Sequence, residues 1–223
     1  CKWVKLACQR HLDDLEHGEE RGLWFDYDAA QLVINFFGLL KHSKGEWAGQ
    51  PMRLEAWQQF TIWVFFGWKR EDGTRRFRTF YEEIARKNGK STMGAGIGLY
   101  LMIADREPGA EVYSAATKKA QALITFEEAQ RMVKASPALR KRLTNFRNNI
   151  HIEETASKFE PLGRDTDSMD GLNVHGAIID ELHAHKTGEM VDVLETARGA
   201  RRQPVQFEIT TSGFDRQSIC FQH

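Results

Sequence analysis

The sequence has few cysteines, no long apolar run and no visible signal peptide. The spacing of Cys1, Cys8 and Cys220 matches neither a metal site nor a disulfide framework, so we expect a reducing compartment. The richest apolar stretch, residues 60–68, is too short to cross a bilayer, which takes about 20 apolar residues. Because the chain begins with Cys1 and not with methionine, we expect a fragment of a longer protein.

An excess of charge of one sign is also absent. The 31 lysines and arginines balance 31 acidic residues, which excludes a protein that is basic over its whole surface, as many nucleic-acid binders are. A local basic patch stays compatible with this balance. The hydrophobic fraction of 41% is sufficient for a core, and 223 residues fit one large α/β domain, alone or with appendages.

The most informative stretch is the turn at residues 84–92. It follows an alternating, strand-like segment at 77–83 and precedes a small, apolar, helix-like segment at 93–104. A strand, a Gly-Lys-Ser turn and a helix start together form a phosphate cradle, because backbone N–H groups and the helix dipole face the anion. In such a cradle Lys90 reaches the β- and γ-phosphates and the Ser91 hydroxyl holds Mg²⁺.

The match to a phosphate loop is incomplete at its first position. The usual pattern has a glycine there, and this chain has Ile84. The stretch alone therefore leaves both a nucleotide site and a chance match open. Gly94, Gly96 and Gly98 follow in the predicted helix, where glycine is costly, and we expect them to allow very close packing on a sheet.

The remaining pattern predicts alternating strands and helices after a helical start. We expect helices at 2–21 and 29–40 to form an N-terminal appendage, residues 1–50, beside a core at 51–223. Further predicted helices and strands lie in the core, the helices at 54–66, 118–134 and 189–199, and the strands at 109–116, 149–153, 158–162, 174–181 and 205–210. The strands at 149–153 and 158–162 are expected to form a hairpin.

A second informative stretch is the apolar strand that ends in Asp180 and Glu181. At the carboxyl edge of a parallel sheet, Asp180 would bind the metal of a nucleotide and Glu181 would polarise the attacking water as general base. The strand at 205–210 ends in Thr210-Thr211-Ser212, whose hydroxyls would sense the γ-phosphate. Each motif alone also fits an ordinary strand end.

Two other polar groups are weaker candidates. His183 and His185, with His175 nearby, suggest zinc, but they share a face only on a strand and no second ligand cluster follows. The acidic loop at 164–172 lacks the twelve-residue calcium pattern, so we interpret it as a solvated loop.

Two residues upstream of the turn have side chains that suit adenine. The Gln58 amide both donates and accepts, so it can bind the edge of the base, and Trp57 can stack on it. A core position explains Trp57 at least as well, and the sequence leaves both interpretations open for Gln58.

Several stretches together resemble the large terminase subunit of tailed bacteriophages. The resemblance covers nearly the whole chain and rests on segments that occur in the family's order: 45–50, 54–58, 66–68, 86–91, 180–185 and 209–213. That family has a deviant phosphate loop with an arginine after its first residues, which accounts for Ile84 and draws attention to Arg86. The resemblance implies a P-loop NTPase fold, with a mainly parallel central sheet flanked by helices and an N-terminal helical appendage.

The resemblance also implies roles for residues. ATP would contact Trp57, Gln58, Arg86, Lys87, Asn88, Gly89, Lys90, Ser91 and Thr92. Lys90, Glu181 and Arg86 would be catalytic, Ser91 and Asp180 would hold Mg²⁺, and Thr210, Thr211 and Ser212 would couple hydrolysis to movement. An arginine from a neighbouring subunit completes the site in that family. The candidates here are Arg164, Arg198, Arg201 and Arg202.

The implied function is an ATPase motor that translocates double-stranded DNA into the procapsid, without the C-terminal nuclease domain. The expected partners are DNA, the portal protein and the small terminase subunit, in a homo-oligomeric ring on the procapsid and as a monomer in isolation. We expect no membrane and the cytoplasm of the bacterial host. The alternatives are a catalytically weak DNA-binding or scaffold module and another P-loop ATPase.

Overall fold

The structure is a computed structural model that describes residues 1–163, 171–185, 188–213 and 219–222. Its chain forms two compact units, which we describe separately: residues Cys1–Gly38 with Arg53–Arg78, and residues Leu39–Met52 with Thr79–His223. None of the helices in the described ranges combines the length and the apolar character that a membrane crossing needs.

The first unit is mainly helical. It contains α1 (Lys2–His17), η1 (Glu19–Arg21), β1 (Leu23–Phe25), α2 (Tyr27–Leu39), α3 (Ala56–Gly67) and β2 (Trp68–Arg70). The last residue of α2, Leu39, is counted with the second unit. The two short strands β1 and β2 pair antiparallel. The buried carboxylate of Asp14 on α1 forms ion pairs with Arg21 and Arg76. A buried carboxylate is stable only when it is paired, so this cluster fixes α1 within the unit.

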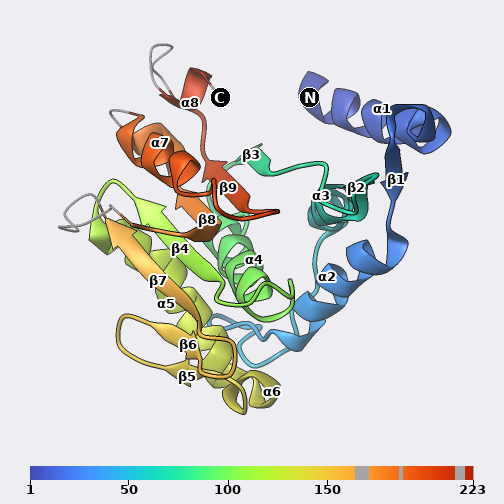
Figure 1. The fold of residues 1–223 in the computed structure, drawn as a ribbon. Helices are drawn as coiled ribbons and strands as arrows, with labels where there is room; N and C mark the ends of the chain where they lie inside the picture. The colour runs from blue at the N-terminus through green and yellow to red at the C-terminus, as the bar shows by residue number, and fades with distance from the viewer. Residues whose placement is uncertain (164–170, 186–187, 214–218, 223) are drawn as a thin grey trace. The chain divides into compact units, whose positions relative to one another are not determined.

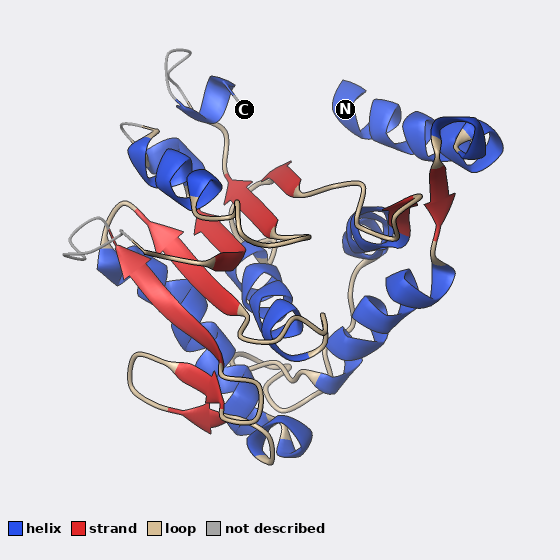
Figure 2. Cartoon of the chain, viewed as in Figure 1, coloured by secondary structure: helices blue, strands red, loops and turns tan. Residues whose placement is uncertain are grey.

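The second unit is built on a seven-stranded sheet in the order β3-β9-β8-β4-β7-β6-β5 (Figures 1 and 2). Its strands are β3 (Thr79–Glu83), β4 (Glu111–Ala116), β5 (Thr144–Asn145), β6 (Ile150–Ile152), β7 (Ser157–Gly163), β8 (Val174–Asp180) and β9 (Val205–Thr210). The five neighbouring strands β3, β9, β8, β4 and β7 are parallel. Strands β6 and β5 continue the sheet beyond β7 and are antiparallel to their neighbours. The carboxyl ends of β3, β8 and β9 therefore meet at one edge, as ligand sites in open α/β sheets require.

Helices cover both faces of this sheet. The helices of the second unit are α4 (Lys90–Ile103), α5 (Lys119–Ala135), α6 (Pro137–Arg140), η2 (Leu182–Ala184), α7 (Glu189–Thr196) and α8 (Ile219–Gln222). Helices α4 and α5 lie on one face and α7 lies on the other (Figure 1). Met190, Val191 and Leu194 of α7 pack on Ala177 and Ile179 of β8, and with helices on both faces every residue of β8 is buried.

Close packing of α4 on the sheet depends on glycine. A Cβ atom added at Gly94 would lie 2.8 Å from Ile178 and 2.9 Å from Ile209, and one added at Gly98 would lie 2.7 Å from Phe159. These distances are shorter than real contacts, so the prediction of close packing is confirmed at both positions. Glycine costs a helix interior about 1 kcal/mol relative to alanine, and the packing offsets this cost.

The observed elements follow the predicted pattern with few differences. The predicted hairpin is confirmed, because β6 and β7 pair antiparallel. The strands β1, β2 and β5 were not predicted, since two or three residues are too few to show a period. The expected boundary at residue 50 stays a prediction. The compact units of the structure have other bounds, because residues 53–78 pack with the N-terminal helices in the first unit.

Candidate nucleotide-binding site

The turn between β3 and α4 has the backbone of an anion-binding loop. Lys87 and Gly89 both have positive φ angles, of 66° and 75°, and Gly89 is the residue before the first turn of α4. The Asn88 side-chain amide donates to the carbonyl oxygens of Ala85 (3.1 Å) and Arg86 (3.3 Å), which holds the curve of the loop. Left-handed residues in such a turn direct successive N–H groups to one side, where the helix dipole also attracts an anion.

Lys90 is the buried cation of this loop. Its side chain is nearly covered, and its ammonium nitrogen lies 3.4 Å from the Ile84 carbonyl oxygen and 3.5 Å from that of Ala85. These contacts are long for hydrogen bonds of a charged donor, which usually measure about 2.7–2.9 Å. The ammonium group therefore lies inside the curve of the loop with donor capacity that phosphate oxygens can use.

Ser91 and Asp180 come together from opposite sides of the site. The Ser91 hydroxyl, in the first turn of α4, donates to Asp180 Oδ2 at 2.8 Å. Asp180 is buried at the end of β8, and its other oxygen accepts the N–H of Glu181 at 2.9 Å. Thr125 of α5, which is fully buried, donates its hydroxyl to the same Oδ2 at 3.0 Å. Sequence reasoning missed Thr125, because no motif marks a threonine in the middle of an amphipathic helix.

Glu181 has an unusual backbone and an unusual side chain. Its φ and ψ angles of 55° and 51° lie in the left-handed region, which costs a residue with a side chain about 1 kcal/mol or more. Its Oε2 atom is buried and accepts no hydrogen bond from the described part of the chain. His183 Nδ1 lies 3.1 Å from this atom. A buried carboxylate oxygen with unused acceptor capacity is suited to accept a proton or to polarise a water molecule.

The threonines at the end of β9 contact the acidic strand and the phosphate loop. The carbonyl oxygen of Thr210 accepts the N–H of Ile84 at 3.0 Å, and its hydroxyl accepts the backbone N–H of His183 at 3.0 Å. Ser212 donates to Glu83, the last residue of β3, at 2.6 Å. The three predicted motifs therefore meet at adjacent strand ends of one sheet.

The predicted adenine residues belong to the first unit and are described within it. Gln58 lies in the first turn of α3, where its side-chain amide oxygen accepts the backbone N–H of Glu55 at 2.9 Å. Trp57 is 37% exposed. This exposure exceeds that of a core aromatic, and the role of both residues stays a prediction.

The arginine candidates lie in different places. Arg86 is exposed on the phosphate loop. Arg198 pairs with Glu195 at 2.9 Å, and Arg201 pairs with Glu107 at 2.9 Å and donates to the carbonyl of Asn173, just before β8. The amino end of β8 is the edge opposite Asp180, so Arg201 is remote from the phosphate loop of its own chain. Arg202 is exposed, and Arg164 lies outside the described residues.

The histidines have other partners than zinc. In the described ranges no three His, Cys, Asp or Glu side chains gather as a metal site would require. His175 lies 2.7 Å from Asp105 in the interior, and burial lowers the pKa of His185 below its ordinary value. The predicted acidic loop falls largely on residues 164–170, outside the described residues.

A parallel sheet with a phosphate loop, a buried Ser–Asp pair and a glutamate at the next position defines a P-loop NTPase. The comparison with protein families is more specific. Residues 56–223 match the family model of the terminase large subunit, ATPase domain, and the chain belongs to this family of ATPases.

Individual relatives agree with this membership. The chain is 29% identical over 180 residues to the terminase large subunit of Enterobacteria phage HK97, covering 75% of this chain and 33% of that protein. The crystal structure of the HK97 large terminase superposes with a TM-score of 0.73 at 26% identity, covering 85% of this chain and 39% of the other. Protein YmfN of Escherichia coli K12 is 40% identical over 52 residues, 23% of this chain and 11% of that protein. The chain thus spans about a third of the HK97 large terminase.

The fold extends to a more distant phage. The large terminase ATPase domain of Thermus phage P74-26 superposes with a TM-score of 0.51 at 17% identity, covering 62% of this chain and 61% of the other. This likeness concerns the fold alone.

Proposed function

We propose that this chain hydrolyses ATP to translocate double-stranded DNA into a phage procapsid, as the motor part of a large terminase. The observation that carries the proposal is the meeting of Lys90, Ser91, Asp180 and Glu181 at adjacent strand ends. The partners would be DNA, the portal protein and the small terminase subunit, in a ring of identical chains on the procapsid. The place of action would be the cytoplasm of the bacterial host.

Each residue has a part in this hydrolysis. The loop at 84–89 and Lys90 bind the β- and γ-phosphates, and Arg86, exposed on that loop, contacts the γ-phosphate. Glu181, whose buried Oε2 accepts no hydrogen bond from the described residues, orients the attacking water and accepts its proton. Thr210 and Thr211 link this event to β9. Gln58 and Trp57 recognise adenine, and Arg198, Arg201, Arg202 and Arg164 stay the candidates for the arginine from a neighbouring subunit.

The residues present fit a magnesium ion. The Ser91 hydroxyl and Asp180 carboxylate are oxygen ligands, and they lie 2.8 Å apart. Adjacent ligands of octahedral Mg²⁺, at about 2.1 Å from the ion, are separated by about 3 Å. Two protein ligands also suit this ion, which keeps waters and takes its other ligands from phosphates. When bound, Mg²⁺ neutralises charge on the phosphates.

Two substitutions test the proposed hydrolysis. We expect Lys90→Ala to lose nucleotide affinity, because it removes the cation of the loop. We expect Glu181→Gln to bind ATP normally and to lower kcat by about 100-fold or more, since general-base catalysis contributes about 10²–10⁴-fold. Fluorescent-nucleotide binding and phosphate release measure the two effects.

The control is Lys5→Ala, which removes an exposed lysine from α1 in the first unit. It should behave as the parent does. Hydrolysis that survives unchanged in both Lys90→Ala and Glu181→Gln would rule out this site. A slow rate of hydrolysis in the parent chain would not rule out the site, because a single chain lacks the arginine that a neighbouring subunit supplies.

A further inference from the structure

His183 lies between the general base and the threonines of β9. Its Nδ1 atom is 3.1 Å from Glu181 Oε2, 2.9 Å from Thr210 Oγ1 and 3.3 Å from Thr211 Oγ1. Its backbone N–H also donates to Thr210 Oγ1 at 3.0 Å. One imidazole thus contacts both the catalytic strand and its neighbour, through the side chain and the main chain.

The hydrogen bonds determine where the imidazole proton lies. The Thr210 hydroxyl donates its single proton to the Thr211 carbonyl oxygen at 2.9 Å, so toward Nδ1 it can only accept. The Glu181 carboxylate is also an acceptor. Because the two nearest oxygens are acceptors and the Thr211 hydroxyl is farther away, at 3.3 Å, we assign the proton to Nδ1, which donates it to Thr210. Glu181 Oε2 stays close in an electrostatic contact without a hydrogen bond.

We propose that His183 is a positioning residue that holds the general base and ties it to β9. The Nδ1–H dipole attracts the Glu181 carboxylate, and the two bonds to Thr210 fix the turn in which Glu181 takes its left-handed conformation. A shift of β9 would then move Glu181, and a change at Glu181 would be transmitted to β9. This inference rests on the proposed hydrolysis by Glu181.

The test separates positioning from folding. We expect His183→Ala to lower kcat for ATP by about 10-fold to 100-fold, the usual cost of losing a group that orients a catalytic ligand. The KM for ATP should not change, because the hydrogen bonds and the ion pair of His183 go to Thr210, Thr211 and Glu181 and not to the loop residues at 84–91. His183→Asn should recover part of the rate, since the asparagine amide nitrogen can donate where Nδ1 does.

Three further readouts complete this test. His151→Ala, on β6, is the matched control and should hydrolyse ATP as the parent does. In the double variant with Thr210→Val, the second loss should add little to the first. Nitrogen-15 NMR of the parent, which needs no turnover, should show His183 protonated at Nδ1.

The outcomes are distinguishable. A parent rate retained in His183→Ala, or protonation at Nε2 alone, would overturn the positioning role while leaving the proposed function intact. Hydrolysis retained in Lys90→Ala would instead contradict the proposed function.

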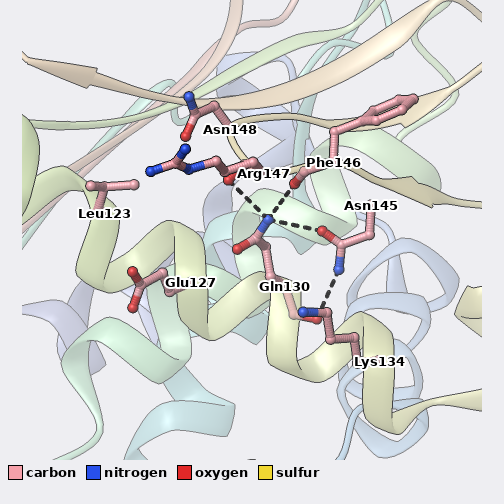
Figure 3. A pocket seen from close by; sticks show the side chains of 8 residues that line it. All are labelled: Leu123, Glu127, Gln130, Lys134, Asn145, Phe146, Arg147 and Asn148. Carbon is pink, nitrogen blue, oxygen red and sulfur yellow. Dashed lines mark hydrogen bonds between the residues drawn. The ribbon is translucent and has the colours of Figure 1, made fainter.

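A second, independent observation concerns a groove between α5 and the turn from β5 to β6 (Figure 3). Its volume is about 410 Å³. The Gln130 side-chain amide of α5 donates to the carbonyl oxygen of Phe146 at 2.6 Å and to Asn145 Oδ1 at 2.9 Å, and Asn145 Nδ2 donates back to the Gln130 carbonyl at 3.1 Å. These bonds hold the turn in place, with the Phe146 ring 58% exposed at its tip.

The segment that runs from α5 to β6 past this groove is strongly basic, although the whole chain is neutral and Glu127 of α5 also lines the groove. Residues 129–152 contain no aspartate or glutamate. Five exposed cations lie in this segment, which are Lys134, Arg140, Lys141, Arg142 and Arg147. None of the five forms an ion pair with any other described residue. Lys134 and Arg147 line the groove together with Phe146, and the other three cations lie between them in the chain. We call the five cations and Phe146 the basic surface.

We infer that the basic surface contacts the sugar–phosphate backbone of double-stranded DNA. Exposed, unpaired cations release counterions when they meet phosphates, and such contacts bind the DNA backbone without reading its sequence. This inference also rests on the proposed function, in which the substrate moved is duplex DNA.

Salt dependence tests the basic surface directly. We expect the triple variant Arg140→Ala, Arg142→Ala, Arg147→Ala to bind a short DNA duplex more weakly. The slope of log K against log salt should fall by about 2 to 3, since each phosphate contact contributes about 0.9. Fluorescence anisotropy measures both quantities, and basal ATP hydrolysis should stay at the parent level.

The control removes three exposed cations from the first unit, in the variant Lys2→Ala, Lys5→Ala, Arg53→Ala. It should keep the parent slope. An equal slope in the two triple variants would overturn the inference, as would a parent that fails to bind duplex DNA at low salt. Loss of binding to poly-glutamate without loss of binding to DNA would assign the surface to an acidic protein instead. None of these outcomes would contradict the proposed ATP hydrolysis, which is tested separately by its loss in Lys90→Ala.

Discussion

At the scale of the residue, the site depends on how Asp180 is held. A buried carboxylate needs donors, and Asp180 has the hydroxyls of Ser91 and Thr125 and the N–H of Glu181. The Ser–Asp pair could be predicted from two motifs. Thr125 could not, because its role depends on α5 crossing the end of β8, and a single sequence does not show this crossing.

Substitution of Thr125 shows what this hydroxyl contributes. Thr125→Val keeps the shape and removes the donor to the buried Asp180 carboxylate. We expect the free energy of unfolding to fall by about 1.5–3 kcal/mol, the usual range for a hydrogen bond to a charged group. Urea titration measures the loss. Thr125→Ser, which retains the hydroxyl, should recover most of it, and equal stability of the valine and serine variants would contradict this role.

At the scale of the element, sequence and structure agree best where a period is long. The strands β4, β8 and β9 are six or seven residues long and almost wholly buried in the parallel sheet, and the prediction places the ends of each within two residues. The glycines of α4 indicated close packing before any partner was known. Short elements such as β1 and β5 form because a neighbour offers hydrogen bonds, so their own residues carry no signal.

The residues of the candidate site likewise fall into those that a local motif predicts and those that only the fold brings into place. Lys90, Ser91 and the acidic pair lie in motifs whose spacing the sequence shows. The role of His183 arises from β9, which is more than 20 residues away in the chain, and an interpretation of the histidines as metal ligands could not include it. A long-range contact of this kind is a property of the folded sheet and not of a local pattern.

At the scale of the whole molecule, one buried acid makes stability depend on pH. Glu82 lies on β3, its Oε2 atom is buried and accepts no hydrogen bond from a described residue, and burial raises its pKa to about 7. Between the ordinary value of 4.5 and about 7, the folded state therefore holds a proton that the unfolded state has lost. The unfolded state binds fewer protons in this window, so stability falls as pH rises through it.

Glu82→Gln removes this dependence while keeping the shape of the side chain. We expect the variant to be about as stable as the parent at pH 4.5 and more stable at pH 8, by about 1–3 kcal/mol, since each pKa unit corresponds to about 1.4 kcal/mol. Urea titrations followed by circular dichroism at the two pH values measure the difference between variant and parent. The comparison at each pH cancels other groups, including His185, whose lowered pKa acts in the opposite direction because its charged form is disfavoured in the fold. A variant whose advantage is the same at both pH values would show that Glu82 keeps an ordinary pKa, and that another group must account for any pH dependence of the fold.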